Sequence, residues 1–458
     1  MSQNNIIDTH AHLTENDFKR DRDQVIDRAR QAGVEYIINV GYDLKSSFQS
    51  VELSEKYDCC YAAVGIHPHD AKALDENAFK ELGNLAKHPK VVAIGETGMD
   101  YHRNLSPKEI QIAAFKKQLA WAETLKLPAV VHDRDAHKEI MDILKERPGL
   151  KVVLHCFAGD AEMAKEAKKR GYLLSVGGPV TFKNSKHLPE VLRTVGIESL
   201  LLETDCPYLA PEPHRGARNE PAYLEIIVRR ISELLDPLTY DDVCRATTLN
   251  AKKFFNIGKI DPAKIAYQIR NSLYLNITNR CTNACVFCIR QKTDFIKGHN
   301  LRLEREPDLQ EVIGAIGDPS KYKEVVFCGY GEPLLRLDLV KQVAEDLKKK
   351  KSRVRLNTNG QGNLIAGRNV VPELTGLIDE VSISLNVHSG EVYDKLCPSR
   401  FGGRAYQEVK GFAVECRRAG IKTAVTVLDL PGVDLEAARQ TAKDLGVDIR
   451  IRHYDVVG

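Results

Sequence analysis

The stretch Asn5-Ile6-Ile7-Asp8-Thr9-His10-Ala11-His12 begins with a short apolar run and ends in two histidines. Because alternate residues of a β-strand point to the same side, a strand here places His10 and His12 side by side. Two imidazoles at the end of a buried strand form half of a metal site. The remaining ligands of such a site are expected at the ends of other strands.

The composition around this stretch is that of an ordinary globular protein, with 43% hydrophobic and 28% charged residues. A chain of 458 residues exceeds the usual size of one hydrophobic core, so two domains are expected. The net charge of +3 is too small to indicate nucleic-acid binding by itself.

Neither a secretory signal nor a membrane span is visible in the sequence. The N-terminus lacks a basic stretch followed by an apolar one, and no apolar run reaches about eighteen residues. The 11 cysteines are mostly scattered singly, which favours reduced thiols over a disulfide framework. We therefore expect a cytoplasmic protein with no membrane partner.

The first half alternates short apolar runs with stretches of helical periodicity, a pattern typical of βα units and a parallel sheet. Eight runs are predicted as strands: 6–8, 36–40, 61–65, 91–95, 129–131, 152–154, 173–176 and 200–202. Eight strands with intervening helices in about 250 residues fit a (β/α)8 TIM barrel over residues 1–257. A doubly wound open sheet is the alternative.

The second half restarts the alternation after a polar stretch, 258–271, which is predicted to be a linker. Six further strands are predicted at 272–278, 324–328, 353–357, 380–385, 422–428 and 448–452. Six βα units over residues 272–458 indicate a partial (β/α)6 barrel, so both halves belong to the α/β class.

Histidines and carboxylates follow the strands of the first half. In a TIM barrel the chemistry lies at the carboxyl ends of the strands. Each such residue alone is more often structural, but seven of them at the same topological position indicate a metal centre: His10, His12, His67, Glu96, His132, His155 and Asp205.

The mixture of ligand types indicates which ions such a centre holds. Imidazole and carboxylate donors together suit Zn²⁺, Mn²⁺ or Mg²⁺. The donors outnumber the needs of one ion, so we expect two ions bridged by Glu96, with Asp205 also acting as the general base.

The motifs that carry these residues resemble those of the TatD-family metal-dependent DNases. They occur in family order as Asp8-Thr9-His10-Ala11-His12, Gly65-Ile66-His67-Pro68, Gly95-Glu96-Thr97-Gly98-Met99-Asp100, His132-Asp133-Arg134, His155-Cys156-Phe157-Ala158-Gly159 and Glu203-Thr204-Asp205-Cys206-Pro207. The resemblance implies an amidohydrolase-type barrel, two divalent metals and phosphodiester hydrolysis, usually from the 3′ end of DNA.

The resemblance also assigns roles to single residues. It implies that His10, His12, Glu96, His132, His155 and Asp205 are metal ligands, and that His67 acts on the substrate side or transfers a proton. Residues 215–221 match the family's Arg-Gly-Lys-x-Asn-x-Pro segment, except that Ala217 replaces the usual lysine.

The substrate is less well defined by the sequence. Without a lysine at 217, Arg134, Arg215 and Arg218 remain as phosphate-binding candidates, although each could equally be a surface salt-bridge residue. DNA or another phosphodiester is the expected substrate. A small-molecule ester or amide is the alternative, and a third hypothesis makes one half a non-catalytic binding module.

A second chemistry is indicated by Cys281-x3-Cys285-x2-Cys288, in the loop after the first strand of the second half. Three thiolates on one loop hold three irons of a [4Fe–4S] cluster and leave the fourth iron open. A structural zinc site completed by His299 is the alternative. Cys328, Cys397 and Cys416 form no compact motif and are expected to be mainly structural.

The cysteine spacing resembles that of the radical SAM superfamily. Gly329, Gly331 and Glu332, in Gly329-Tyr330-Gly331-Glu332-Pro333, are similar to the segment that binds the methionine amino group of S-adenosyl-L-methionine (SAM). Ser384 and Asn386 are alternate residues of a predicted strand and are expected to face one side. They are similar to ribose-binding residues, although polar strand-end caps explain them nearly as well.

This second resemblance implies a reaction but no substrate. SAM would be cleaved reductively to a 5′-deoxyadenosyl radical, with an electron donor such as flavodoxin or ferredoxin. The whole arrangement resembles TatD-associated radical SAM proteins, and it predicts a bifunctional enzyme.

Overall fold

The computed structural model describes residues 5–453 and divides into two compact units at Ile260–Asp261. All eleven cysteines are free, as the sequence predicts. Among the described residues, no helix is long and apolar enough to cross a membrane.

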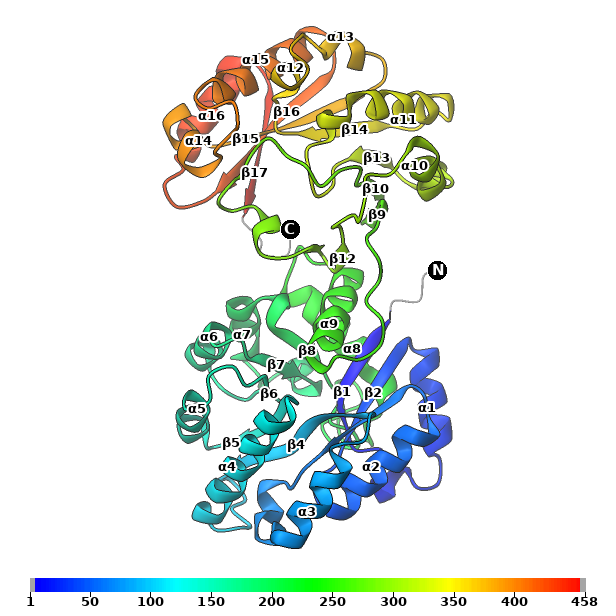
Figure 1. The fold of residues 1–458 in the computed structure, drawn as a ribbon, viewed down its shortest axis with the longest axis vertical. Helices are drawn as coiled ribbons and strands as arrows, with labels where there is room; N and C mark the ends of the chain where they lie inside the picture. The colour runs from blue at the N-terminus through cyan, green and yellow to red at the C-terminus, as the bar shows by residue number, and fades with distance from the viewer. Residues whose placement is uncertain (1–4, 454–458) are drawn as a thin grey trace. The chain divides into compact units, whose positions relative to one another are not determined.

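The first unit is a parallel barrel of eight strands that follow one another in chain order (Figure 1). The strands are β1 (Ile6–Ala11), β2 (Val34–Val40), β3 (Cys60–Val64), β4 (Val91–Asp100), β5 (Ala129–Arg134), β6 (Val152–Leu154), β7 (Leu173–Val176) and β8 (Leu200–Leu202). The predicted TIM barrel is therefore confirmed, and the open-sheet alternative is wrong.

Helices connect these strands and flank the barrel. They are α1 (Arg22–Gln31), α2 (Leu44–Lys56), α3 (Glu76–Leu85), α4 (Lys108–Leu125), α5 (His137–Lys145), α6 (Ala161–Lys169), α7 (Leu188–Val195), α8 (Leu224–Leu234) and α9 (Tyr240–Phe255). Thr239 and Asp242 form a capping box at the start of α9. Phe254 and Phe255 at its end, and Ile257 just beyond it, pack into an apolar cluster with buried residues from seven of the eight strands.

Three barrel strands are longer than their apolar runs. β1, β4 and β5 continue to Ala11, Asp100 and Arg134, so His10, Glu96 and His132 lie within strands rather than after them. The polar extensions are held by pairing, since Thr97–Asp100 of β4 pair with Val131–Arg134 of β5. The carboxyl ends of these strands therefore present functional side chains from regular backbone.

The second unit contains one seven-stranded sheet in the order β17-β16-β15-β14-β13-β10-β9. Its six parallel strands are β10 (Ser272–Leu275), β13 (Glu324–Phe327), β14 (Val354–Thr358), β15 (Glu380–Asn386), β16 (Lys422–Asp429) and β17 (Asp448–His453). All six coincide with predicted strands, and the sheet stays open between β17 and β9, as a partial barrel requires.

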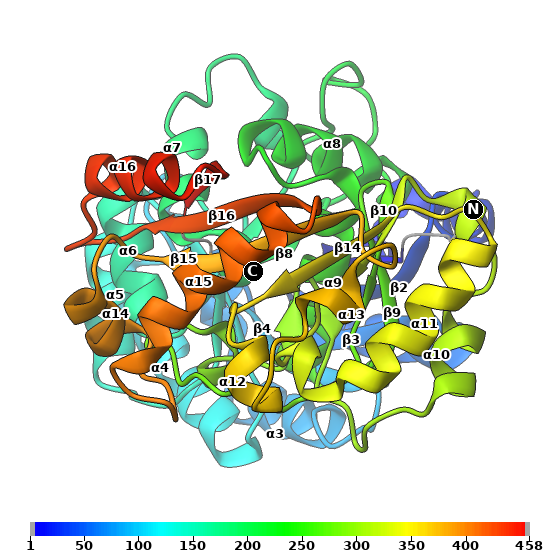
Figure 2. The ribbon, with the colours of Figure 1, turned by 90° about the horizontal axis from the view of Figure 1, so that it is seen from above.

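Helices cover the apolar face of this sheet. They are α10 (Leu309–Ile316), α11 (Leu337–Lys349), α12 (Gly362–Ala366), α13 (Val371–Leu374), α14 (Gly390–Leu396), α15 (Arg404–Arg418) and α16 (Leu435–Leu445). Figure 2 shows α11 and α15 lying across the strands. Alternate strand residues such as Leu356 and Ile383 pack in one core with Val340 and Phe412 of these helices.

The predicted linker at 258–271 needs a correction. Its later part forms β9 (Ala266–Ile269), which pairs antiparallel with β10. The edge strand has only four residues, of which one is buried, so no apolar alternation reveals it. A further hairpin, β11 (Phe295–Ile296) and β12 (His299–Asn300), lies in the long connection between β10 and α10.

Candidate active sites

Glu96 occupies the centre of the barrel mouth, on an irregular part of β4. The pairing with β5 shifts register between Ile94 and Thr97, and such a bulge redirects the side chain that it carries. Gly98 has φ +141°, and a Cβ there would lie 2.0 Å from the carbonyl oxygen of His132. The Gly-Glu-Thr-Gly sequence therefore lets β4 approach β5 closely while Glu96 points inward.

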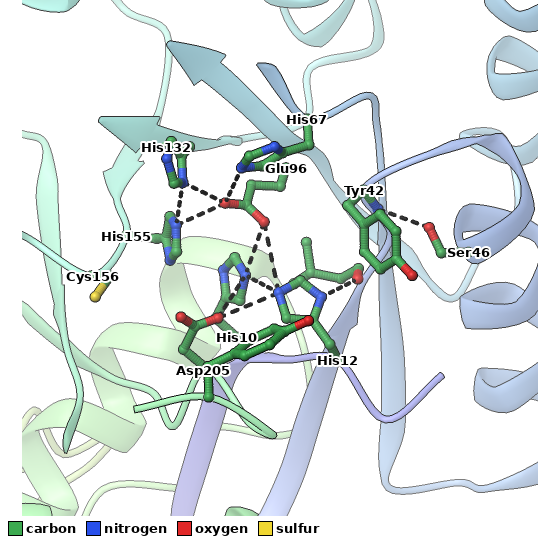
Figure 3. Close-up of polar contacts among 12 residues, drawn as sticks. His10, His12, Tyr42, Ser46, His67, Glu96, His132, His155, Cys156 and Asp205 are labelled. Atoms are coloured by element: carbon green, nitrogen blue, oxygen red, sulfur yellow. Dashed lines mark hydrogen bonds and ion pairs between the residues drawn. The ribbon is translucent and has the colours of Figure 1, made fainter. Parts of the chain in front are cut away.

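One oxygen of Glu96 faces the ligands from β1 and the end of β8 (Figure 3). Its Oε2 lies 3.4 Å from His10 Nε2 and 3.7 Å from His12 Nε2. Asp205 Oδ1 lies 3.3 Å from the same His12 nitrogen and 3.8 Å from that of His10. Two imidazoles and two carboxylates thus converge on one point.

The other oxygen of Glu96 faces a second group of histidines. Its Oε1 lies 2.8 Å from His132 Nδ1, 2.9 Å from His155 Nε2 and 3.5 Å from His67 Nε2. Donor atoms of His10, His12 and Glu96 lie within 4.8 Å of one another, as do those of His67, Glu96 and His132. The arrangement can hold two ions that share Glu96.

Contacts behind the histidines aim their nitrogens at this point. His12 donates from Nδ1 to the Val40 carbonyl oxygen at 2.9 Å, which leaves the lone pair on Nε2. Asp100 Oδ2 lies 3.3 Å from His132 Nε2, and Asp100 Oδ1 accepts a hydrogen bond from the Arg103 amide at 2.7 Å. Outer carboxylates and carbonyls orient metal-binding histidines in this way.

The carboxylates and one histidine of the site have pKa values that suit a cation. Burial alone would raise the pKa of Glu96, but the histidines around it hold that pKa well below its usual range. Burial would likewise raise the pKa of Asp205, but its hydrogen bond with His12 and the charges of His10 and His155 together lower it. Burial lowers the pKa of His67 to about 3, so this imidazole is neutral. The site combines ionised carboxylates with a neutral histidine.

Several buried polar atoms at this centre lack a partner. Among the described residues, His10 Nδ1, His155 Nδ1 and Glu203 Oε2 are buried without a hydrogen bond. Such groups cost roughly 1–3 kcal/mol each when they are left unsatisfied. Two of these atoms, His155 Nδ1 and Glu203 Oε2, lie 3.7 Å from each other behind the centre. The imidazole Nε2 atoms and carboxylates that face the centre itself are donors that fit divalent metal ions.

A brace between the first and last strands places Asp205. Asp8 is fully buried and accepts hydrogen bonds from the Thr204 amide at 3.0 Å and the Thr204 hydroxyl at 2.6 Å. Burial raises the pKa of Asp8 to about 7. The adjacent Asp205 amide donates to the His10 carbonyl oxygen at 2.9 Å, and Asp205 itself has φ +55°. The brace therefore joins both ligand-bearing strands.

The centre opens into a cavity of about 670 Å³. Its lining includes His67, Arg103, Arg134, Tyr42, Tyr208 and Leu209 in addition to the central carboxylates and histidines. Of the three predicted phosphate-binding arginines, Arg134 is the one that lines this cavity.

The cysteine loop of the second unit follows β10. Its thiols, those of Cys281, Cys285 and Cys288, are free and half-buried. Arg290 donates from Nε to Cys288 Sγ at 3.3 Å, and the Asn283 amide donates to Cys281 Sγ at 3.5 Å. Donors to sulfur are typical of iron–sulfur ligands. The free thiols and their N–H partners fit a cluster.

A buried hydrogen-bond network supports this loop from behind. The Gln361 amide donates to Asn283 Oδ1 at 2.8 Å and accepts from the Thr282 hydroxyl at 2.9 Å. Asn283 donates to the Tyr393 hydroxyl at 2.9 Å. The Ala284 amide also donates to the Pro398 carbonyl oxygen at 2.8 Å. The loop thus rests on residues that are not ligands.

The glycine-rich segment after β13 packs against the start of the same loop. A Cβ on Gly329 would lie 2.4 Å from Asn276 Oδ1, and one on Gly331 would lie 2.2 Å from the Arg280 carbonyl oxygen. The Glu332 amide donates to that Arg280 oxygen at 2.7 Å. Only glycines allow this close approach, which brings the segment beside Cys281.

Residues 7–256, more than half of the chain, match the family described as TatD related DNase. The chain belongs to this family. Residues 275–445 match the radical SAM superfamily. The chain therefore joins a metal-dependent hydrolase of the TatD nuclease family to a radical SAM enzyme domain.

Individual relatives cover the TatD half. The uncharacterized metal-dependent hydrolase YabD of Bacillus subtilis is 44% identical over 255 residues, which are 55% of this chain and 100% of that protein. A protein of Erwinia tasmaniensis named 3'-5' ssDNA/RNA exonuclease TatD is 37% identical over 260 residues, with coverages of 55% and 100%. The crystal structure of the Escherichia coli TatD homologue YJJV matches with TM-score 0.53 and 30% identity, covering 55% of this chain and 98% of that one.

Arg215 and Arg218, two of the predicted phosphate-binding candidates, lie outside the metal cavity of the TatD domain. Arg218 forms a two-pronged ion pair with Asp21, at 2.8 and 2.7 Å, and its guanidinium lies over the Phe18 ring. Arg215 lies over the Phe182 ring and 3.9 Å from Glu212. Neither lines the cavity, because each guanidinium is already engaged by an aromatic ring and a carboxylate.

In the radical SAM domain, the prediction that Ser384 and Asn386 face one side needs a correction. The pairing of β15 with β16 shifts register between them, and Asn386 has φ +64°. Asn386 instead donates to Cys397 Sγ at 3.4 Å. A hydrogen bond with Cys397, together with burial, raises the pKa of the Cys285 thiol, so Cys397 adjoins the cysteine loop.

Glu332 also accepts structural hydrogen bonds that its motif does not predict. Its carboxylate accepts from the Thr358 hydroxyl at 2.8 Å, the Asn359 amide at 2.7 Å and the Leu334 amide at 3.0 Å. These bonds tie the ends of β13 and β14 together.

The sequence interpretation missed three carboxylates around the metal centre: Asp8, Asp100 and Glu203. Each lies in a motif that was already recognised, within four residues of a predicted ligand. That proximity is the signal that could have revealed them.

Proposed function

We propose that the TatD domain removes nucleotides from the 3′ end of single-stranded DNA with two divalent metal ions. The observation that carries this proposal is Glu96, whose two oxygens face two separate groups of ligands. His10, His12 and Asp205 would hold one ion with Glu96, and His132 and His155 would hold the other. When bound, two such ions lower the pKa of the attacking water and stabilise charge on the phosphoryl oxygens.

The protein's own groups complete this chemistry. The ionised Asp205 carboxylate is suited to take a proton from the attacking water. Neutral His67, on the cavity wall, would transfer a proton on the substrate side. Arg134 would bind a phosphate of the strand.

For the second domain, we infer a [4Fe–4S] cluster on Cys281, Cys285 and Cys288, with SAM bound beside Gly329 and Gly331. When bound, the reduced cluster would cleave SAM to a 5′-deoxyadenosyl radical. An electron donor such as flavodoxin or ferredoxin would be required.

The nuclease proposal is tested with Glu96→Ala and Asp205→Ala on 5′-labelled single-stranded DNA. Each variant is expected to lose at least about a thousandfold in kcat/KM while keeping the wild-type unfolding midpoint. Glu52→Ala, which removes an exposed carboxylate on α2, is the matched control and should behave as wild type. Full activity in both site variants would refute the proposal.

The radical proposal is tested by anaerobic reconstitution followed by SAM and dithionite. About four irons per chain and formation of 5′-deoxyadenosine are expected. Zinc in place of iron would identify the cysteine loop as a structural site instead.

A further inference from the structure

Two consecutive exposed apolar side chains, Tyr208 and Leu209, line the metal cavity of the TatD domain. Tyr208 is 51% exposed and Leu209 is 38% exposed. Most other exposed large apolar side chains of the described chain stand singly and away from this cavity. An apolar surface rimmed by polar groups beside a reactive centre marks a contact surface for a ligand.

This surface adjoins the metal ligands directly. The ring centroid of Tyr208 lies 6.1 Å from that of His12. Tyr42 lies on the same histidine, at 5.7 Å between centroids, and lines the same cavity. An aromatic group held against Tyr208 would therefore lie next to a phosphate bound at the ions.

The far side of the cavity has the opposite character. Arg103 follows β4, Arg134 is the last residue of β5, and both are exposed in the cavity wall. In a barrel whose strands run in chain order, β4 lies across the mouth from β8, which Tyr208 follows. The cavity thus has an apolar wall and a cationic wall with the metal ligands between them.

The apolar wall is rigid. Asn219 donates to the Tyr208 carbonyl oxygen at 2.7 Å and to that of Thr204 at 2.8 Å. Leu209 has φ +53°, a left-handed conformation that residues with a β-carbon adopt only when their surroundings hold them there. A Cβ on Gly178 would lie 1.9 Å from the Leu209 carbonyl oxygen, so this packing requires a glycine. These backbone contacts hold the Tyr208 and Leu209 side chains in exposed positions.

We propose that Tyr208 and Leu209, the stacking shelf, hold the base of a nucleotide adjoining the scissile phosphate. The proposal rests on the nuclease function proposed above and deepens it by assigning the residues that recognise an unpaired base at the strand end. A base has a flat π-face that stacks on tyrosine irrespective of sequence, and a base-paired end does not offer that face. The cationic wall would take the next phosphates of the same strand.

The test compares single-stranded DNA with two analogues that carry an abasic residue, one at the terminal and one at the penultimate position. In the wild type, removing the stacked base is expected to lower kcat/KM by about fivefold to about a hundredfold. In Tyr208→Ala, the ratio of kcat/KM for intact over abasic DNA should fall close to one. Tyr208→Phe keeps the ring, and so it should keep most of the ratio although it loses the hydrogen bond to Glu15.

Phe48→Ala serves as the control, because Phe48 is 40% exposed on α2 but does not line the cavity. It should leave the ratio at the wild-type value. If the wild type cleaves intact DNA but Tyr208→Ala leaves the ratio of kcat/KM for intact over abasic DNA unchanged with both analogues, the stacking shelf is wrong and the proposed nuclease function still stands. No cleavage of intact DNA by the wild type with Mn²⁺, Mg²⁺ or Zn²⁺ would overturn the proposed function and the shelf with it.

Discussion

The two halves of the chain gather their candidate ligands in opposite ways. In the TatD domain the donors come from separate strands between β1 and β8, spread over residues 10–205. In the radical SAM domain three thiols lie within residues 281–288 of one loop. The first site therefore exists only when the barrel closes, whereas the ligands of the second stay together in any fold of the chain.

The difference determines what keeps each site in shape. Bonds that close the barrel, such as that from the Asp205 amide to the His10 carbonyl oxygen, also set the distances between ligands. The cysteine loop is supported instead by Gln361 and Tyr393, which are not ligands. Damage to barrel closure should therefore reduce stability and metal binding together, while damage to the loop's support should separate the two.

The largest effect is expected from removing one thiol of the loop. Cys285→Ser should lower reconstituted iron from about four to less than about one per chain, because serine is a poor ligand for iron. Hydrolysis of single-stranded DNA should stay within about twofold of wild type, since the barrel ligands lie in the other unit.

Iron and sulfide assays on the same preparation measure this effect. Cys416→Ala, a change to a buried cysteine of α15, is the control and should retain its iron. Full iron content in Cys285→Ser would show that the loop is not the cluster site.

The next effect concerns the brace between β1 and β8. Asp8→Asn places an amide nitrogen where an oxygen accepts from Thr204, so a buried donor loses its acceptor. We expect a loss of about 2–3 kcal/mol in the free energy of unfolding and a tenfold to hundredfold weaker affinity for Mn²⁺.

Urea denaturation and metal titration measure the two quantities. Asp75→Asn, at the exposed N-cap of α3, is the matched control and should change the free energy of unfolding by less than about 0.5 kcal/mol with unchanged metal affinity, because asparagine caps a helix about as well as aspartate. If Asp8→Asn weakened metal binding without loss of stability, barrel closure and ligand geometry would be separate properties.

Much of the fold and the ligands of both sites could be predicted from the sequence. Every predicted barrel strand is present because apolar runs mark buried strands, and the ligands were found because each follows such a run. The cysteine loop was found because its ligands are local in sequence. Short-range patterns therefore revealed both sites.

The features that could not be predicted from the sequence depend on contacts between residues that are distant along the chain. Arg218 resembled a phosphate ligand because its partner Asp21 is almost two hundred residues away in the sequence. Asn386 was placed beside Ser384 because strict alternation cannot anticipate a register shift. Asp100 was not assigned because its contact with His132 depends on the pairing of β4 with β5.

A smaller effect is expected at that same contact. Asp100→Asn should weaken the affinity for the second metal ion about tenfold, because His132 loses the carboxylate that orients its ring. The unfolding free energy should change by less than that of Asp8→Asn, since Asp100 does not join β1 to β8.

Metal titration of the apoprotein, with two binding steps resolved, measures this affinity. Asp135→Asn changes a neighbouring exposed carboxylate that pairs with His102, and it should leave both steps unchanged. Equal weakening of both steps by Asp100→Asn would argue that Asp100 acts on the whole centre and not through His132.

The smallest effect is expected behind the cysteine loop. Asn283→Ala removes one hydrogen bond from the Tyr393 hydroxyl and one from the Gln361 side-chain amide, which still bond each other at 3.1 Å. The loss should cost about 1–2 kcal/mol and lower the unfolding midpoint of this domain by about 2–8 °C. The loop keeps all three thiols, so iron content after reconstitution should remain above about three per chain.

Tyr393→Phe and the double variant complete a double-mutant cycle with Asn283→Ala, in which a coupling energy of at least about 0.5 kcal/mol is expected if the two side chains act together. If Asn283→Ala instead removed the iron as fully as Cys285→Ser, the cluster site would depend on distributed support as the barrel site does, and the contrast between the two halves would disappear.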